Sequence, residues 1–346
     1  MKLLSDDPMK VLVVKRDKVG DLLLATPMLA ALRAAWPAAR IDLLASDYNA
    51  WVVAGSRDVD RVWTFGRARV GRHLSPRAAF AQLGLFLRLR AQRYDVAIVA
   101  NGESSPRALR RALWAGAGRT IAYSEAPARG LTDRLPQPQG GHERDRMLAL
   151  LAPLGIGMPH PPPLPAYEPT PQALEEAREW LRGAGIAGRG HVVIGLGARR
   201  PKKQPTAAQV LRWSDALQRR HGLATVFMWT PGGSDNPLYP GDDAAAQAVL
   251  DARAPHVHAF RGPLQPAAAL AWLARTSIFP DSGLMHLAAA SRGGVLGLYA
   301  ETAISPHPAR WGPLGANVDF LDAAQSVAQL DDDLVMARVE GLLQRP

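Results

Sequence analysis

The fold is decided by the stretch KVLVVKRDKVGDLLLATP, residues 10–27, which combines a strand, a charged turn and the start of a helix. Within it, the β-branched run Val11–Val14 predicts a short buried strand. Gly20 permits a tight turn, and Thr26 followed by proline is typical of a helix N-terminus. We therefore expect a single turn after Gly20 and then a helix over 27–36, as in the repeating unit of a parallel sheet.

The same alternation of strand and helix continues along the chain on both sides of a proline-rich stretch. Short apolar runs are typical of strands buried on both faces, and amphipathic segments between them are typical of helices that cover a parallel sheet. The sequence therefore predicts an α/β fold with doubly wound, Rossmann-like sheets. Strands are expected at 41–45, 61–65, 95–100, 192–196, 224–229, 257–260, 277–279 and 295–299, and helices at 78–93, 171–183, 207–222, 244–252, 266–274 and up to 290.

The proline-rich stretch from Pro153 to Pro171 marks the clearest boundary in the sequence. Such a composition predicts a stiff, extended linker between two domains. We expect an N-terminal domain over 1–165 and a C-terminal domain over 166–325. The last segment, 326–346, has acidic residues followed by apolar residues at helical spacing, which predicts a terminal helix that could pack back on the first domain.

The composition limits the classes of protein to which the chain can belong. Its 346 residues suit two domains. The absence of cysteine excludes disulfides, thiolate zinc sites and a cysteine nucleophile. No segment resembles a signal peptide or is apolar over the ~18 residues of a membrane helix, so we expect a cytoplasmic protein that could dock on a membrane surface. The formal charge of +10 favours anionic partners, namely nucleic acid, phospholipid headgroups or phosphorylated sugars.

The first candidate for a functional site is the segment 15–21, directly after the opening strand. Open parallel sheets bind ligands at the carboxyl ends of their strands, so we expect the two domains to face one central cleft. The Asp21 carboxylate could accept a proton there from a hydroxyl that attacks a sugar carbon. The alternative is that Asp21 only caps the turn that follows.

Two further candidate segments follow strands of the second domain. Gly195–Lys203 combines small residues, which expose backbone N–H groups, with four cations, and this combination favours a diphosphate ligand. A solvated basic turn is the alternative. Asp281–His286 lies between a strand and a helix, where Ser and Gly can hold a phosphate oxygen. The alternative is capping by Asp281 and Ser282, with His286 as a hydrogen-bonded structural residue.

Together, the three segments resemble glycosyltransferase family 9, the lipopolysaccharide heptosyltransferases. Residues 10–27 resemble the opening of these enzymes, and DSGLMHLAAA at 281–290 resembles their motif D-[ST]-G-x-x-H-x-x-A-A. GLGARRPKKQP at 195–205 lies where the family has a small-residue loop followed by K-x-W-P. The chain departs from the family at Gln204, which replaces the usual Trp, and at Ala300–Thr302, which replaces a G-P-T-like turn.

The resemblance implies a GT-B fold in which the first domain binds the acceptor and the second binds an ADP-sugar, with ADP-heptose as the expected donor. It implies inverting transfer to a lipopolysaccharide core or similar anionic glycan, with neither a metal nor a cofactor. Carried onto this chain, Asp21 becomes the general base and Lys202 the donor-phosphate cation. The further donor-phosphate residues are Ala198, Arg199, Ser282 and Gly283, supported by Asp281, Leu284 and His286, while Asp242 and Asp243 are ribose candidates and Lys18, Gly20, Arg67, Arg69 and Arg72 are acceptor candidates.

Two other functions stay open at this point. One is a transferase of the same architecture that uses a different nucleotide sugar in another glycan pathway. The other is a non-catalytic protein that binds nucleic acid or a membrane surface through its basic residues. A NAD enzyme is disfavoured, because Arg200 occupies the third glycine position of a dinucleotide fingerprint that would begin at Gly195.

Overall fold

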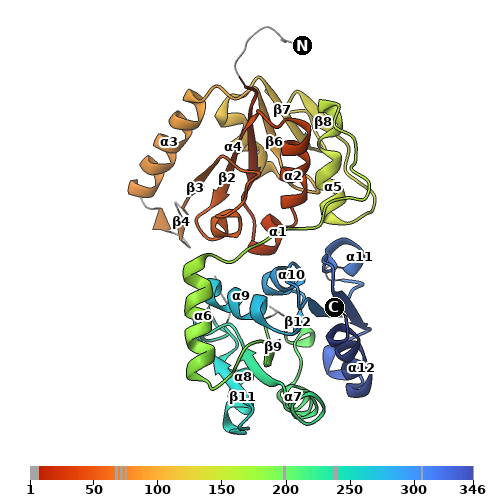
Figure 1. Cartoon of the computed structure of the whole chain (residues 1–346). Coiled ribbons are helices and arrows are strands. Elements are labelled where there is room, and N and C mark those ends of the chain that lie inside the picture. Colours follow the sequence, from red (N-terminus) through yellow and green to blue (C-terminus); the bar gives the residue numbers. More distant parts are fainter. Residues whose placement is uncertain are drawn as a thin grey trace. The chain divides into compact units, whose positions relative to one another are not determined.

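Two compact units, Met1–Glu168 and Pro169–Pro346, make up the computed structural model of the chain (Figure 1). The structure describes residues 8–66, 69–70, 73–74, 76–197, 200–236, 241–304 and 307–345. The units divide within the proline-rich segment, after residue 168. The sequence predicted a boundary three residues earlier, after residue 165. Each unit has its own sheet and its own covering helices.

The sheet of the first unit is parallel throughout, with the opening strand at its centre. Its strands are β1 (Lys10–Lys15), β2 (Arg40–Ser46), β3 (Arg61–Phe65), β6 (Val96–Val99), β7 (Arg119–Tyr123) and β8 (Asp133–Leu135). They are ordered β3-β2-β1-β6-β7-β8, so β1 pairs with β2 on one side and with β6 on the other. The central position explains why β1 is apolar on both faces.

The helices of the first unit include two that we did not predict from the sequence, over 106–115 and 143–149. Within the described residues they are α1 (Val19–Leu23), α2 (Thr26–Ala35), α3 (Pro76–Ala91), α4 (Pro106–Ala115) and α5 (Glu143–Ala149). The helices α3 and α4 pack on one face of the sheet, against Leu12 and Val14 of β1. The segment that holds α4, β7, β8 and α5 was not predicted, although α4 has arginines on one side and buries Ala108, Leu109, Ala112 and Ala115 on the other.

The second unit repeats the topology of the first. Its strands are β9 (His191–Gly195), β10 (Ala224–Met228), β11 (Val257–Phe260), β12 (Ser277–Pro280), β13 (Val295–Ala300) and β14 (Val318–Ala323), in the parallel order β11-β10-β9-β12-β13-β14. Its helices are α6 (Pro171–Gly183), α7 (Ala207–His221), α8 (Asp243–Asp251), α9 (Leu264–Leu273), α10 (Gly283–Ala289), α11 (Pro308–Trp311) and α12 (Asp332–Leu343), with a 3-10 turn η3 at Pro201–Lys203. Counted along the chain, both sheets have the strand order 3-2-1-4-5-6 of dinucleotide-binding folds.

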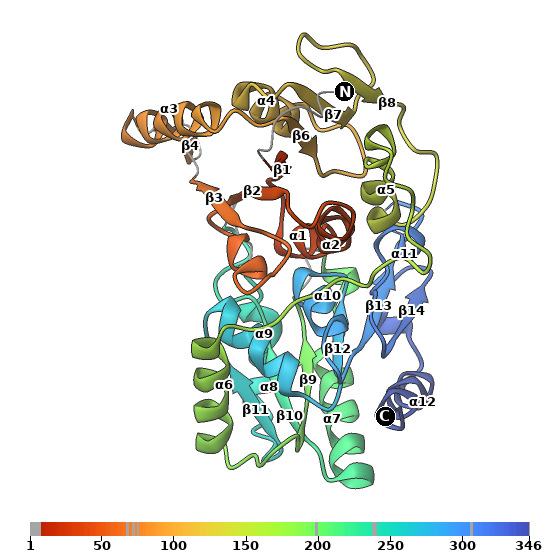
Figure 2. The same ribbon diagram turned by 45° about the horizontal axis from the view of Figure 1, so that its top comes forward.

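The side chains of β9 alternate between two cores, one on each face of the second sheet. Val192 and Ile194 belong to the core that contains buried residues of α7, α8 and α12. Val193 belongs to the core that contains buried residues of α6, α9 and α10. Helices therefore cover both faces of this sheet (Figure 2). The predicted α/β, doubly wound architecture is confirmed.

The terminal helix α12 packs within the second unit. Asp332 at its start accepts a hydrogen bond from Trp213 Nε1 of α7 at 2.6 Å and pairs with Arg212 of the same helix. Its apolar side fills the core between the second sheet and α7. The buried side chains of α12 are Val335, Met336, Val339 and Leu342. The apolar side of α12 is therefore buried within its own unit, and packing on the first domain stays a prediction.

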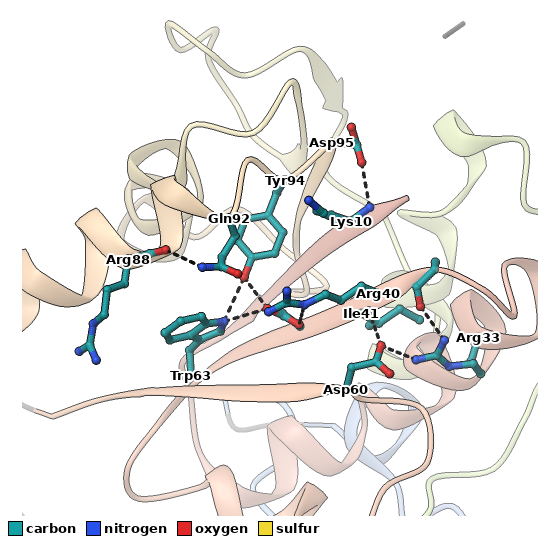
Figure 3. A network of polar contacts seen from close by, with 12 residues as sticks. Lys10, Arg33, Arg40, Ile41, Asp60, Trp63, Arg88, Gln92, Tyr94 and Asp95 are labelled. Carbon is teal, nitrogen blue, oxygen red and sulfur yellow. Dashed lines mark hydrogen bonds and ion pairs between the residues drawn. The ribbon is translucent and has the colours of Figure 1, made fainter. Parts of the chain in front are cut away.

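A polar network joins strands of the first unit toward their amino ends (Figure 3). Asp42 of β2 is fully buried and accepts hydrogen bonds from Trp63 Nε1 at 2.9 Å and from the Tyr94 hydroxyl at 2.6 Å. The Arg40 guanidinium donates to both oxygens of Asp42 at 3.0 Å. These bonds compensate for the burial of the carboxylate. They fix the end of the sheet that lies away from the carboxyl ends of the strands.

Candidate functional site

In each sheet the carboxyl ends of the first and fourth strands lie side by side, at the point where the strand order reverses. These strands are β1 and β6 in the first unit, and β9 and β12 in the second. Ligands of open parallel sheets bind at such points. Of the segments predicted from the sequence, 15–21 extends from β1, 195–203 from β9 and 281–286 from β12. The structure thus places every predicted segment at the reversal point of its own sheet.

Asp21 lies in α1, the short helix that follows β1. Its side chain is partly buried, and its Oδ2 accepts a hydrogen bond from the backbone N–H of Lys18 at 3.1 Å. Burial raises the pKa of Asp21, the ammonium of Lys15 opposes this change, and the negative charges of Asp17 and Glu143 add to it. The carboxylate therefore caps the turn and also has the raised proton affinity of a general base.

Charged and polar groups tie the end of β1 to the end of β6 and the start of α5. Lys15 is fully buried, and its Nζ lies 3.4 Å from Asp17 Oδ2. Asp17 also accepts a hydrogen bond from Asn101 Nδ2 at 2.6 Å. The backbone N–H of Gly102 donates to Glu143 Oε1 at 2.8 Å, and the Glu143 carboxylate leaves no room for a Cβ at Gly102. These contacts hold the groups whose charges act on Asp21.

Four arginines, from the loop after β1 and from α4, crowd together in the first unit. Arg111 lies over the ring of Phe65, with 4.4 Å from its Cζ to the ring centroid. Burial lowers the pKa of Arg111, and so do the charges of Arg16, Arg110 and Arg107. The Nε atoms of Arg16 and Arg111 are buried without a hydrogen-bond partner in the part of the chain that the structure describes. Such mutual repulsion of cations is typical of a surface that binds an anion.

The acceptor residues predicted from the sequence are only partly described. Arg67 and Arg72 lie outside the described residues, and of Arg69 only the main chain is described, in the two-residue strand β4 (Arg69–Val70). Lys18 is exposed, and Gly20 is buried in α1. Their roles stay predictions. The arginines of α4 were missed because that helix was itself not predicted.

The two lysines of the loop after β9 have opposite environments. Lys202 has 63 % of its side chain exposed, and its Nζ pairs with Glu301 Oε1 at 3.1 Å. Lys203 has only 6 % exposed, and its Nζ lies 2.7 Å from Asp281 Oδ2. This buried ion pair joins the loop after β9 to the loop after β12. It is the counterpart, in the second unit, of the contacts between the ends of β1 and β6.

The segment after β12 begins the helix α10. Ser282 Oγ accepts a hydrogen bond from the Met285 backbone N–H at 3.4 Å, so Ser282 caps the helix, as the alternative interpretation requires. Gly283 and Leu284 are the first two residues of α10, and His286 is buried in it. Phosphate binding by this segment stays a prediction. Two other predicted phosphate residues lie outside the described part of the chain, Ala198 and Arg199.

Both candidate ribose residues accept hydrogen bonds from other side chains. Asp242 accepts one from Gln204 Nε2 at 2.6 Å. Asp243 accepts one from Trp229 Nε1 at 2.7 Å, and this bond lowers the pKa of Asp243. Gln204, which replaces the Trp of the resembled family, thus ties the loop after β9 to the start of α8. Ribose binding by either aspartate stays a prediction.

Lys203 and Glu301 were not predicted as site residues. Glu301 follows β13 with a φ of 55°, a backbone conformation that strains a residue other than glycine. The sequence did hold a signal for Glu301, because 300–302 departs from the turn of the resembled family. It held none for Lys203, because two adjacent lysines look equivalent until the fold brings Asp281 to one of them.

No group of three or more His, Asp or Glu side chains among the described residues could hold a metal ion. Among the same residues, no helix combines the length and the apolar character that crossing a bilayer requires.

Solved structures with the same fold cover nearly the whole chain. A glycosyltransferase of family 9 from Veillonella parvula matches with a TM-score of 0.81 at 21% identity, over 98% of each chain. The ADP-heptose lipopolysaccharide heptosyltransferase II of E. coli matches at 0.74 and 20%, over 97% of this chain and 98% of that one. The E. coli heptosyltransferase WaaC with ADP matches at 0.74 and 19%, over 96% and 100%. No match was found among curated protein sequences. The fold is GT-B, as predicted.

The family is shown by a match in sequence. The model of glycosyltransferase family 9 (heptosyltransferase) matches residues 83–332, which is more than half of the chain. The chain therefore belongs to glycosyltransferase family 9, and it is a glycosyltransferase, as the resemblance implied. The match includes the loops after β9 and β12 but begins beyond Asp21.

Proposed function

We propose that this enzyme transfers a heptose from ADP-heptose to an anionic saccharide of the lipopolysaccharide core type, with inversion and without a metal ion. The observation that carries the proposal is the family match over 83–332, which includes the segment 281–286. The donor is supported by two structures of similar fold, one named for ADP-heptose and one in complex with ADP. In the proposal, the first unit binds the acceptor and the second binds the donor.

The proposed reaction is a single displacement with Asp21 as the general base. The acceptor hydroxyl gives its proton to Asp21 while its oxygen forms a bond to the anomeric carbon of the donor. The bond from that carbon to the diphosphate oxygen breaks, and ADP leaves with the electron pair. One displacement inverts the configuration at the carbon. The raised pKa of Asp21 supports this role, because a stronger base takes up the proton more readily.

The departing diphosphate needs positive charge, which we assign to Lys202 and the backbone N–H groups of its loop. Lys202 is exposed and pairs with Glu301. Donor binding in this proposal exchanges that carboxylate for the diphosphate. Lys203 has a different role, because its ion pair with Asp281 holds the two loops of the donor site together.

The four crowded arginines support an anionic acceptor. Guanidinium groups bind phosphate and carboxylate in a bidentate manner, and Arg107, Arg110 and Arg111 lie on one short helix beside Arg16. A phosphorylated or carboxylated core saccharide has the complementary charge. The same basic surface would hold the enzyme at the cytoplasmic face of the inner membrane, where anionic lipids attract such residues.

Calorimetric titration with ADP, GDP and UDP tests the donor. We expect ADP to bind most tightly, and Lys202→Ala to weaken ADP binding by about tenfold, because a charge-assisted contact is lost. Lys10→Ala, at the other end of the first sheet, is the control and should leave the affinity unchanged. Tighter binding of GDP or UDP would favour a second candidate function, a transferase that uses another nucleotide sugar. The observation behind this candidate is Gln204 in the donor loop, where the family usually has Trp.

A further inference from the structure

Lys15, the last residue of β1, is a lysine with none of its side chain exposed. Its ammonium has no hydrogen-bond partner within the described residues, and it forms an ion pair with Asp17 Oδ2 at 3.4 Å. A buried ammonium is costly to desolvate unless negative charge compensates for it. An apolar side chain would fit the end of a central strand more easily, so the charge itself requires an explanation.

Asp17 and Asp21 are the carboxylates on which the Lys15 ammonium acts, and Glu143 is a third carboxylate whose charge acts on Asp21. Asp17 and Glu143 each accept a hydrogen bond from the end of β6, at 2.6 and 2.8 Å, and Asp21 accepts one from the backbone before α1. Burial raises the pKa of Asp21, Lys15 is the cation that opposes this, and Asp17 and Glu143 act in the same direction as burial. The Lys15 ammonium, together with the hydrogen bond from the Lys18 backbone N–H, therefore counteracts burial and two like charges.

We propose that Lys15 is a positioning residue of the reaction, whose buried charge keeps the Asp21 carboxylate ionised and able to accept the acceptor proton. This rests on the role of Asp21 in the proposed function. Without Lys15, only the hydrogen bond from the Lys18 backbone N–H opposes burial and the charges of Asp17 and Glu143, and more of the enzyme carries a protonated Asp21 at neutral pH. A protonated carboxyl group cannot accept the proton, so activity falls at neutral pH and returns as the pH rises.

The test compares the pH dependence of kcat/KM in three variants, with ADP-heptose as donor and a deacylated lipopolysaccharide core saccharide as acceptor. Lys15→Met should move the acidic limb to higher pH, so that the loss at pH 6 exceeds the loss at pH 9 by about tenfold or more. Asp17→Asn removes a negative charge and should move the limb to lower pH. Lys10→Met, at the other end of β1, is the matched control and should not move it.

A merely structural role of Lys15 would not produce opposite shifts in the two variants. A loss in Lys15→Met that is equal at every pH, or a shift in the same direction in both variants, would overturn the proposal. Lys15→Met is expected to fold, because Asp17 has 26 % of its side chain exposed and water can solvate it. Asp17→Asn gives an independent result if Lys15→Met does not fold.

A titration without substrate gives a second readout on the full chain. The Asp21 carboxyl signal can be assigned by its absence from the carbon-13 spectrum of Asp21→Asn. It should titrate at higher pH in Lys15→Met and at lower pH in Asp17→Asn, and an unchanged titration in both would overturn the proposal. The activity of Asp21→Asn separates the proposed role of Lys15 from the proposed role of Asp21. If Asp21→Asn still transfers sugar, the assignment of Asp21 as the general base is wrong. If Asp21→Asn is inactive but the acidic limb of kcat/KM does not move in Lys15→Met, only the proposed role of Lys15 is refuted.

Discussion

Lys202 and Lys203 are neighbours in the sequence, yet one is exposed and the other is buried. Both lie in the 3-10 turn η3, where successive side chains point about a third of a turn apart. Lys202 consequently meets Glu301 at the surface, and Lys203 meets Asp281 in the interior. The turn thereby separates a cation that is available to a ligand from a cation that holds the loop.

Replacing each lysine by methionine should separate these two roles. Lys203→Met leaves the Asp281 carboxylate without its buried partner, and we expect the free energy of unfolding to fall by about 3 kcal/mol. Lys202→Met removes an exposed charge and should change it by no more than about 0.5 kcal/mol, while weakening the binding of ADP. Urea unfolding and calorimetry measure the two effects. Equal stability losses in both variants would contradict the assignment.

Single residues could be predicted from the sequence where their role depends on local position. The placement of Asp21 after the opening strand and the capping of a helix by Ser282 were both predictable in this way, whereas their roles in the reaction stay predictions. Lys203 could not be identified, because its role depends on Asp281, which is 78 residues away. The arginine cluster was missed because α4 was not predicted and because Arg16 and Arg111 come together only in the folded unit.

Among the secondary-structure elements, α12 is capped at its start by Asp331 and is bonded to α7 by Asp332. Asp332→Ala removes an acceptor for Trp213 Nε1 and for Arg212, and we expect a loss of about 1–3 kcal/mol in the free energy of unfolding. Asp333→Ala is the matched control, because this exposed aspartate lies in the same helical turn with no partner among the described residues. Urea unfolding measures both variants. A control as unstable as Asp332→Ala would show that the lost charge, not the bonds to α7, matters.

The strand β9 begins with a buried histidine that should make the stability sensitive to acid. Burial lowers the pKa of His191, whose Nε2 contacts the Leu270 carbonyl at 3.0 Å. Below the unfolded pKa of about 6.5, the unfolded chain takes up a proton that the folded chain does not. The free energy of unfolding therefore decreases as the pH falls from there toward the lowered pKa of the folded state.

His191→Gln tests this dependence, because glutamine can still donate to the Leu270 carbonyl but does not titrate. We expect the loss of stability between pH 7.5 and pH 5.5 to be smaller in the variant than in the wild type. Urea unfolding at the two pH values measures it. The same loss in both proteins would assign the acid sensitivity to other groups.

Elements were predictable where their apolar pattern is strong. The strands β1, β2 and β9 are runs of β-branched and leucine residues at the centre of a sheet, and each was predicted. The edge strand β8 (DRL) is polar and short, so it has no clear pattern. The helix α4 does have buried residues at helical spacing, but most of them are alanines, and it was missed. The surface against which α12 packs was also not predictable, because its amphipathic pattern shows that one face is buried but does not identify the neighbouring element.

At the scale of the whole molecule, the organisation into two parallel sheets was predictable from the repeated strand and helix pattern and from the proline-rich segment. Both sheets then proved to share one strand order, which no single motif of the sequence indicates. That shared order explains why the predicted segments all fall at equivalent points. In our proposal, the acceptor site of the first unit and the donor site of the second lie at equivalent positions, the point in each sheet where the strand order reverses.

The measurement that tests this account most directly compares sugar transfer and ADP binding in the wild type and in Asp21→Asn. We expect transfer from ADP-heptose to fall by about 10²–10⁴-fold, because the general base is lost. ADP affinity should stay within about twofold, because the donor residues belong to the second unit. Transfer within a few-fold of the wild type, with ADP still bound, would contradict the claim that Asp21 takes the proton.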